Sequence, residues 1–427
     1  MQRKWLVMAA ASLFFCFATA ATFTSLGVVL FTMVTELHWT NAAAGVSFSL
    51  LGLTCGLSSP LPAIMMKWIG TRWTIVAGGA VLTAAFALAA VSQHQWQFFI
   101  ATGLMGIGFT LCANVPGIYL IATWFPASSA RMIGFYFMAG AAGGIFGPPV
   151  VEAVVELSGS WRANWLVMSL TAALISGFSA FAIRDVIRVE KVGDVIQARA
   201  IRGVKAAGAA GGAEWTSRQA VLTRQFLIIA LAMLVIQTGV TTVHSVLVTH
   251  LAKLGATRAF GAFAMSIVAF TGTLTKGAAG ALSEHLSPRL LLLSGAALQC
   301  LALLSLGFAD THLIAYAFAV VFGAGWGASW LSCHVLLLKY FGTSAAAGVV
   351  STATVITTAA TLGPLFAGMM ADATGSFTPI FYVFAALLAA IVLGVSLMQP
   401  PPQRAGTLQP LPPDEAQVSM TEAARHA

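Results

Sequence analysis

The stretch GPPVVEAVVELSGSWRANW, residues 147–165, is echoed later in the chain by GPLFAGMMADATGSFTPIF, residues 363–381. Both copies begin with Gly-Pro, carry an acid nine positions later and continue through Gly-Ser to an aromatic residue. Gly147 and Gly363 are 216 positions apart (363 − 147), and so are Glu156 and Asp372 (372 − 156). A constant offset of this kind indicates an internal duplication.

The duplication extends beyond these two stretches. Trp124-Phe125 pairs with Tyr340-Phe341 at the same offset, and the segment KWIGTR, 67–72, pairs with EHLSPR, 284–289, at an offset of 217 (284 − 67). The chain therefore consists of two homologous halves. In a membrane, such halves can rock about a site held between them, which is the physical basis of alternating access.

The composition indicates that the protein is embedded in a lipid bilayer. Of the 427 residues, 59% are hydrophobic and only 8% are charged. Apolar runs of about 20 residues recur throughout, long enough to cross a hydrocarbon core of about 30 Å as helices. We predict an all-α membrane protein with twelve transmembrane helices in two pseudo-symmetric six-helix bundles, near 5–34, 44–66, 74–92, 98–122, 128–151, 164–183, 225–251, 259–282, 290–309, 313–338, 344–370 and 379–398.

The N-terminus has two interpretations. Gln2-Arg3-Lys4, an apolar run and the small residues Ala18-Thr19-Ala20 together resemble a cleaved secretory signal. The apolar run continues to Val34, however, which favours an uncleaved first span.

The distribution of basic residues predicts the orientation. Of the 21 Lys and Arg, only Arg162, Lys253 and Arg258 fall in one set of loops, and Lys276 falls within a span. The other seventeen lie in the opposite loops and tails, which the positive-inside rule assigns to the cytoplasm. We therefore expect a multi-pass protein of a bacterial-type inner (plasma) membrane with both termini cytoplasmic, and we attribute the net charge of +8 to orientation and not to nucleic-acid binding.

Composition also predicts the domain boundaries. We expect an N-terminal six-helix bundle over 1–183, a flexible cytoplasmic linker over 184–224, a C-terminal six-helix bundle over 225–398 and a disordered cytoplasmic tail over 399–427. The linker is polar and glycine-rich, and the tail contains Pro400-Pro401-Pro402.

No motif of an enzyme, a metal centre or a cofactor site is present. The five cysteines stand singly in apolar runs, which favours packing over metal binding. The chain has no GxSxG, HExxH, Walker or GxGxxG sequence in a suitable context. We expect neither an enzyme nor an ATP-driven pump, although a membrane sensor without transport is an alternative.

The segment GALSEHLSPR, 280–289, resembles the signature that the major facilitator superfamily carries between spans eight and nine, and again between spans two and three. The resemblance implies a transporter. It also implies that Arg72, Glu284 and Arg289 belong to this signature, which acts as a conformational motif. In the first copy Lys67 stands where the acid is expected.

Several further motifs resemble the monocarboxylate transporter and oxalate/formate antiporter branch of that superfamily. They are Glu36 to Thr40, the glycines from Gly103 to Gly108 with Pro116, Trp124-Phe125, the glycines from Gly134 to Gly147, and Trp161-Arg162. The branch implies a small organic anion and protons as partners, and a bundle of this type can function as a monomer. Two residues differ from the pattern of the branch. Ser160 stands where the branch carries a glycine, and Gly272 stands where it carries an acid.

Lys276 is the first candidate for a substrate-binding residue. It is the one Lys or Arg firmly inside an expected span, and a cation in hydrocarbon needs water, a counter-charge or an anionic ligand. It lies four residues before Gly280, where the branch usually carries an Arg that pairs with the substrate carboxylate. The alternative is that its ammonium snorkels to the membrane surface.

Polar and aromatic side chains on three other spans complete the expected site. Gln237, Thr241, His244 and Ser245 share one face of span seven, which lines either a cavity or a neighbouring helix. Trp326, Trp330 and His334 share a face of span ten, and Asn114 lies near the middle of span four. We expect Lys276, Asn114, Gln237, Thr241, His244, Ser245 and Trp330 to bind substrate, and Lys276, His244 and His334 to carry protons.

The resulting hypothesis is secondary active transport of a small organic anion, a monocarboxylate, by proton symport or anion exchange. Efflux of aromatic or amphipathic compounds is the alternative within transport, for which the tryptophan face matters more than the cation. Near the non-cytoplasmic surface, Glu152, Glu156, Arg162 and Asp372 are either solvated charges or members of a gate, with Glu156 and Arg162 as one possible pair.

Overall fold

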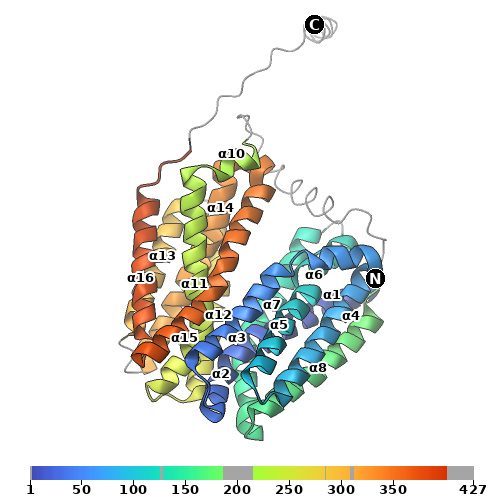
Figure 1. Ribbon diagram of the computed structural model, residues 1–427. Coiled ribbons are helices and arrows are strands. Elements are labelled where there is room, and N and C mark those ends of the chain that lie inside the picture. The colour runs from blue at the N-terminus through green and yellow to red at the C-terminus, as the bar shows by residue number, and fades with distance from the viewer. Residues whose placement is uncertain (1, 126–127, 186–214, 284, 308–311, 402–427) are drawn as a thin grey trace, which may run out of the picture.

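The computed structural model describes residues 2–125, 128–185, 215–283, 285–307 and 312–401, and within these ranges every regular element is a helix. The helices form two bundles, one from each half of the sequence (Figure 1). The all-α fold expected from the composition is therefore confirmed.

The first bundle contains the helices up to residue 182. In chain order they are α1 (Gln2–Thr19), the π-helix η1 (Ala20–Thr24), α2 (Ser25–Leu37), α3 (Asn41–Leu57), α4 (Leu61–Val91), α5 (Gln95–Cys112), α6 (Asn114–Trp124), α7 (Ser129–Ser158) and α8 (Trp161–Ala182).

The second bundle repeats this pattern after a short connecting helix. Its elements are α10 (Ser217–Val221), α11 (Arg224–Lys253), α12 (Arg258–Leu282), α13 (Pro288–Leu306), α14 (His312–Thr358), the 3-10 helix η2 (Ala359–Leu362), α15 (Gly363–Thr374) and α16 (Thr378–Ser396). The helix α10 lies within the expected linker and packs against α14, where the Trp215 and Phe341 ring centroids are 5.7 Å apart.

The helices have the length and composition of membrane spans. In the described part of the chain, eleven helical stretches are long and apolar enough to cross a bilayer, and α3 is a shorter apolar helix. Their outer faces carry large apolar side chains such as Phe181, which is 77% exposed and suited to contact with lipid. The protein is thus a multi-pass membrane protein.

Proline and glycine interrupt the spans where the sequence pattern runs on unbroken. The expected span 44–66 stops at Leu57 and resumes at Leu61, because Pro60 and Pro62 lack the N–H groups that a continuous helix needs. In α14 the chain kinks at Gly342, whose φ of 73° lies in the left-handed region that favours glycine. This kink separates the expected spans ten and eleven within one helical run.

The repeated stretches that define the duplication form matching parts of the two bundle cores. Trp161 and Trp165 are fully buried in the first half, and Phe377 and Phe381, at the equivalent positions, are buried in the second. Trp165 stacks on Phe86 with ring centroids 5.8 Å apart. Equivalent positions of the sequence repeat therefore have the same packing role in the two bundles.

The two ends of the molecule differ in how the bundles meet. At the contact end, which carries the turns near residues 38–40, 159–160, 254–257 and 375–377, the bundles lie side by side (Figure 1). Toward the opposite end, called here the linker end, the ribbons diverge, and α10 and the start of α1 lie there. Residues 186–214 of the expected linker, 402–427 of the expected tail, and Glu284 lie outside the described residues.

Candidate functional site

The ammonium of Lys276 lies against an aromatic ring in the interior of the second bundle. Its Nζ is 3.5 Å from the centroid of the Trp326 ring, which is a close cation–π contact between α12 and α14. Trp326 lies halfway along the span His312–Gly342. The ammonium is therefore held near mid-depth, and does not extend along α12 toward the membrane surface as snorkelling would require.

No carboxylate neutralises this cation within the described part of the chain. The described acids are Glu36, Glu152, Glu156, Asp185 and Asp372, and each lies near an end of the molecule. Trp326 also has a buried Nε1–H without a hydrogen-bond partner in the described structure. The interior thus contains a cation without a carboxylate partner and, beside it, an N–H group without a hydrogen-bond acceptor among the described residues.

Two histidines flank the Lys276–Trp326 pair. The His244 ring on α11 packs edge-on to Trp326 with centroids 5.9 Å apart, and the His334 ring packs edge-on to Trp330 at 5.1 Å. His244 Nδ1 is 2.8 Å from the Val240 carbonyl, and His334 Nδ1 is 2.9 Å from the Trp330 carbonyl. Because a carbonyl only accepts, each Nδ1 carries the hydrogen, and each neutral ring presents Nε2 as an acceptor.

The remaining residues of the expected stripe on α11 have different surroundings. Gln237 and His244 are half-buried, whereas Ser245 is only 3% exposed and packs inside the bundle. The Thr241 hydroxyl donates to the Ala360 carbonyl of η2 at 2.9 Å, so it joins two elements of the same half. The four polar side chains therefore do not share one open surface, because Ser245 is enclosed by neighbouring helices.

Asn114 marks a break in the fourth span. It is the first residue of α6, and α5 ends two residues earlier because Pro116 cannot donate to the Cys112 carbonyl. The Tyr136 hydroxyl donates to the Ala113 carbonyl at 2.9 Å and so satisfies one acceptor at the break. The Asn114 side chain lies outside the described part of the structure.

The two motif arginine positions contact the chain at or just beyond the last helix of each half, Arg289 through its guanidinium and Arg72 through its backbone N–H. Arg289 donates through Nε to the Val395 carbonyl at 3.0 Å and also bonds the Ser396 carbonyl. At the equivalent place in the first half, the Arg72 backbone N–H donates to Asp185 at 3.0 Å. Both interactions lie within one bundle, at the linker end.

A carboxylate joins the two bundles at the contact end. Asp372 on α15 accepts hydrogen bonds from Asn41 N at 2.9 Å, Asn41 Nδ2 at 2.7 Å and Ala42 N at 2.8 Å. These groups form the N-terminus of α3, where orphan N–H groups and the helix dipole favour an anion. Asp372 therefore caps a helix of the other half.

A second polar contact joins the bundles through Arg258 on α12. Its Nη1 donates to the Thr32 hydroxyl of α2 at 2.8 Å, and its Nε lies 3.4 Å from the carboxylate of Glu152 on α7. Glu152 is largely buried, so this ion pair is partly shielded from solvent.

The two contacts use equivalent helix starts in the sequence repeat, although the counterpart of Asp372 is Glu156 and the acid used here is Glu152, one helical turn before it. Thr40 caps α3 and Thr257 caps α12, each accepting a backbone hydrogen bond, and the two are 217 positions apart (257 − 40). Each capped helix start meets an acid from the other half, Asp372 on α15 or Glu152 on α7. We call these contacts the Asp372 lock and the Arg258 lock.

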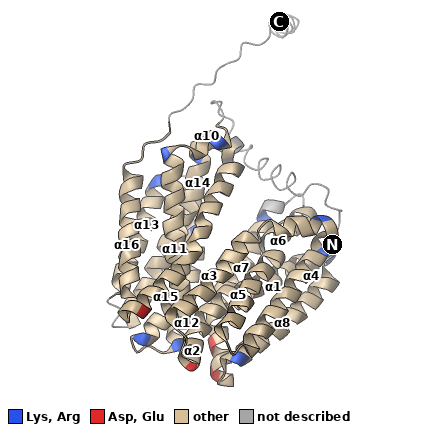
Figure 2. Ribbon diagram, in the orientation of Figure 1, with Lys and Arg blue, Asp and Glu red and all other residues tan. Residues whose placement is uncertain are grey.

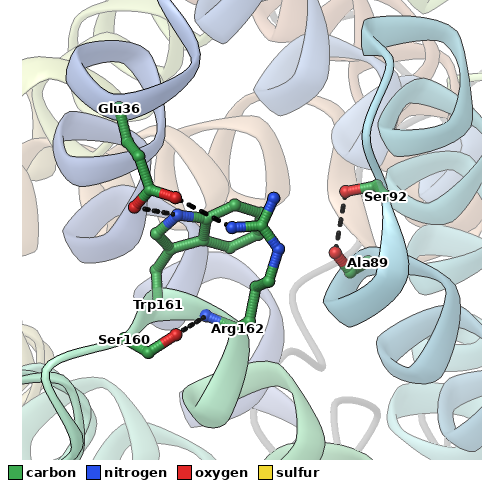
Figure 3. A network of polar contacts seen from close by, with 6 residues as sticks. All are labelled: Glu36, Ala89, Ser92, Ser160, Trp161 and Arg162. Carbon is green, nitrogen blue, oxygen red and sulfur yellow. Dashed lines mark hydrogen bonds and ion pairs between the residues drawn. The ribbon is translucent and has the colours of Figure 1, made fainter.

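Arg162 takes part in a separate network within the first half (Figure 3). It bonds Glu36 at 2.8 Å, its guanidinium lies 4.1 Å from the centroid of the Trp161 ring, and Trp161 Nε1 donates to Glu36 at 2.8 Å. The pairing of Arg162 with Glu156 considered from the sequence is absent from the described contacts, because the end of α2 brings Glu36 closer.

The close approach of α3 and α15 beside the Asp372 lock depends on Gly45. A Cβ atom at this position would overlap the Pro364 carbonyl oxygen. We expect Gly45→Ala to force the helices apart at a cost of about 1–3 kcal/mol, and thereby to reduce transport several-fold by preventing closure at the contact end. Uptake assays on Gly45→Ala and on Gly177→Ala, where a Cβ meets nothing within 4 Å, check this; equal activity of the two variants would contradict it.

A family model places the chain among known proteins. The model described as Major Facilitator Superfamily matches residues 10–359 and 229–422. The chain belongs to the major facilitator superfamily. This facilitator is therefore a membrane transporter and not an enzyme, as its sequence predicted.

Individual relatives agree with this membership. The facilitator is 24% identical over 363 residues to monocarboxylate transporter 12 of Mus musculus, a match that covers 79% of this chain and 74% of that protein. It is 34% identical over 90 residues to the uncharacterized transporter ESBP6 of Saccharomyces cerevisiae, covering 21% of this chain but only 13% of that protein. The crystal structure of the nucleoside transporter NupG superimposes with a TM-score of 0.72 at 15% identity, covering 93% of this chain and 98% of that one, and shows the shared fold.

The sequence did not reveal which residues of this facilitator meet. Lys276 and Trp326 each stand out in the sequence, but their pairing depends on the rotation of α12 against α14. The Asp372 lock joins residues 331 positions apart, and the only signal for it was the repeat, which placed an acid at equivalent sites in both halves.

Proposed function

We propose that this facilitator is a secondary active transporter that carries a small monocarboxylate by proton symport or anion exchange. The observation that carries the proposal is the Lys276 ammonium, which lies near mid-depth against Trp326 without an acidic partner among the described residues. A desolvated cation without a counter-charge favours binding of an anion. The similarity to monocarboxylate transporter 12 of Mus musculus supports the carboxylate in particular.

Each expected site residue has a role in this proposal. Lys276 pairs with the carboxylate, Trp330 lies along the substrate path, and Asn114, at the break between α5 and α6, is a further candidate for substrate binding. Gln237 and His244 line the same path from α11, while Thr241 and Ser245 support it through packing. Lys276, His244 and His334 are the candidate proton carriers, since each can exist charged or neutral and both imidazoles lie within electrostatic range of the ammonium.

Alternating access follows from how the two halves meet. We assign the linker end and both chain termini to the cytoplasm, on the basis of the basic residues in the loops at that end. With the contact end joined by the Asp372 and Arg258 locks and the ribbons diverging toward the linker end, this arrangement corresponds to an inward-facing state (Figure 2). The halves 1–183 and 225–398 would rock as units, in a bacterial-type inner membrane, with Arg72, Glu284 and Arg289 stabilising the opposite state.

Reconstituted transport tests the proposal. We expect proteoliposomes that contain the purified monomeric chain to take up labelled acetate or benzoate faster than protein-free liposomes do when the lumen is made alkaline, or to exchange it for internal carboxylate. Labelled succinate should accumulate poorly, because its second charge would be buried without a partner. Absence of both uptake and exchange for every monocarboxylate, in protein that remains folded, would contradict the proposal.

A further inference from the structure

Phe137 on α7 is a large apolar side chain that stays 45% exposed on the helix that faces the second bundle. It packs edge-on to Phe15 of α1, with ring centroids 6.2 Å apart, and lies beside Tyr136 at 6.1 Å. The helices α1 and α7 both belong to the first half, and α7 also runs next to α12 of the second half (Figure 1).

The contacts between α7 and α12 set which residues lie opposite each other. A Cβ atom at Gly144 would lie 3.6 Å from the Cβ of Ala269, and farther toward the contact end Glu152 meets Arg258. The numbers rise on one helix as they fall on the other, so the helices are antiparallel. Phe137 lies seven residues from Gly144, and Lys276 lies seven residues from Ala269, which is nearly two helical turns in each case. The two backbone positions therefore share the facing surfaces and lie at a similar level.

The two facing positions differ in chemistry. The second half presents the Lys276 ammonium on the Trp326 ring, beside Gly272, whereas the first half presents an apolar ring about one helical turn nearer the linker end. When the halves approach at the linker end during the transport cycle, these positions come together around the bound molecule. A substrate that satisfies both has one carboxylate and an apolar body, because a second charge against Phe137 would be desolvated without a partner.

We propose that Phe137 is a specificity-determining residue that contacts the apolar body of a monocarboxylate whose carboxylate is bound by Lys276. This inference rests on the proposed function and extends it to the part of the substrate that Lys276 does not touch. It assigns preference for acids with aromatic or branched bodies to a residue of the first half, opposite the cation. Acids as short as acetate do not reach the ring.

Relative uptake of two acids by Phe137 variants tests this role. In proteoliposomes with the full-length chain, and after subtraction of uptake by protein-free liposomes, Phe137→Ala is expected to lower kcat/KM for labelled benzoate about tenfold, because ring contacts and apolar burial are lost. Uptake of labelled acetate should stay within twofold of the wild type. Phe137→Leu, which retains an apolar side chain, should show a smaller change in the same direction and provides the test if the alanine variant fails to fold.

Phe135 provides the matched control. It is the same residue type on the same helix, 51% exposed, but about 200° away around the helix axis, on the face that points to lipid. Phe135→Ala should leave the benzoate-to-acetate ratio unchanged. The inference is overturned if Phe137→Ala lowers both acids equally or neither, or if Phe135→Ala changes the ratio as much. A wild-type protein that takes up neither acid would instead overturn the proposed function, which is a different result.

Discussion

Replacing Lys276 with alanine is expected to lower monocarboxylate uptake about a hundredfold, because removal of one partner of a buried charge pair costs about 3 kcal/mol. The carboxylate would then enter the interior without any cation among the described residues to receive it. Lys276→Arg should retain part of the activity, since the guanidinium keeps the charge but replaces a compact ammonium by a planar group. Initial rates in proteoliposomes measure the effect.

Lys253 serves as a matched control for this substitution. Its Nζ also lies over an aromatic ring, 4.8 Å from the Phe377 centroid, but at the contact end of α11. Lys253→Ala should therefore leave carboxylate uptake close to the wild-type rate. Benzoate should raise the thermal stability of the wild type and of Lys253→Ala but not that of Lys276→Ala. Undiminished transport by Lys276→Ala would instead favour carriage of aromatic or amphipathic compounds through contacts with Trp326 and Trp330.

Replacing Asp372 with alanine is expected to shift the protein toward the state that is open at the contact end. The substitution removes three hydrogen bonds to the start of α3 and a favourable interaction with its helix dipole. For this exposed carboxylate we expect a change of about 1.4 kcal/mol, equivalent to about tenfold in the ratio of the two states. Combination with Arg258→Ala, which breaks the second lock, should give a larger shift.

Distances between spin labels can report this shift. Labels at Ser158→Cys and Thr374→Cys, one exposed site in each half at the contact end, should move apart in Asp372→Ala when the five native cysteines are replaced by alanine. Glu36→Gln is the matched control, because the Glu36–Arg162 ion pair also lies at the contact end but joins residues of a single half. An unchanged distance distribution in Asp372→Ala, or an equal change in Glu36→Gln, would contradict a locking role.

The local chemistry of the chain determined its helices, its duplication and the depth of its candidate site. Hydrophobic runs of a fixed length predict spans because a bilayer forces each segment to satisfy its own backbone hydrogen bonds. The same reasoning identified Lys276, since a charge inside an apolar run is visible without knowledge of its neighbours. The helix breaks at Pro60 and Pro116 also follow from the local sequence, although the apolar runs continue through both positions.

Only the tertiary structure decided which side chains meet. Lys276 rests on Trp326, Arg162 pairs with Glu36 and not Glu156, and Asp372 caps a helix 331 positions away. These contacts depend on the rotation and register of helices against one another, and in apolar segments many rotations satisfy the same hydropathy pattern equally well. Packing of small residues and the few polar groups at the helix ends selects one of them, which is why partners across the bundles follow from the fold alone.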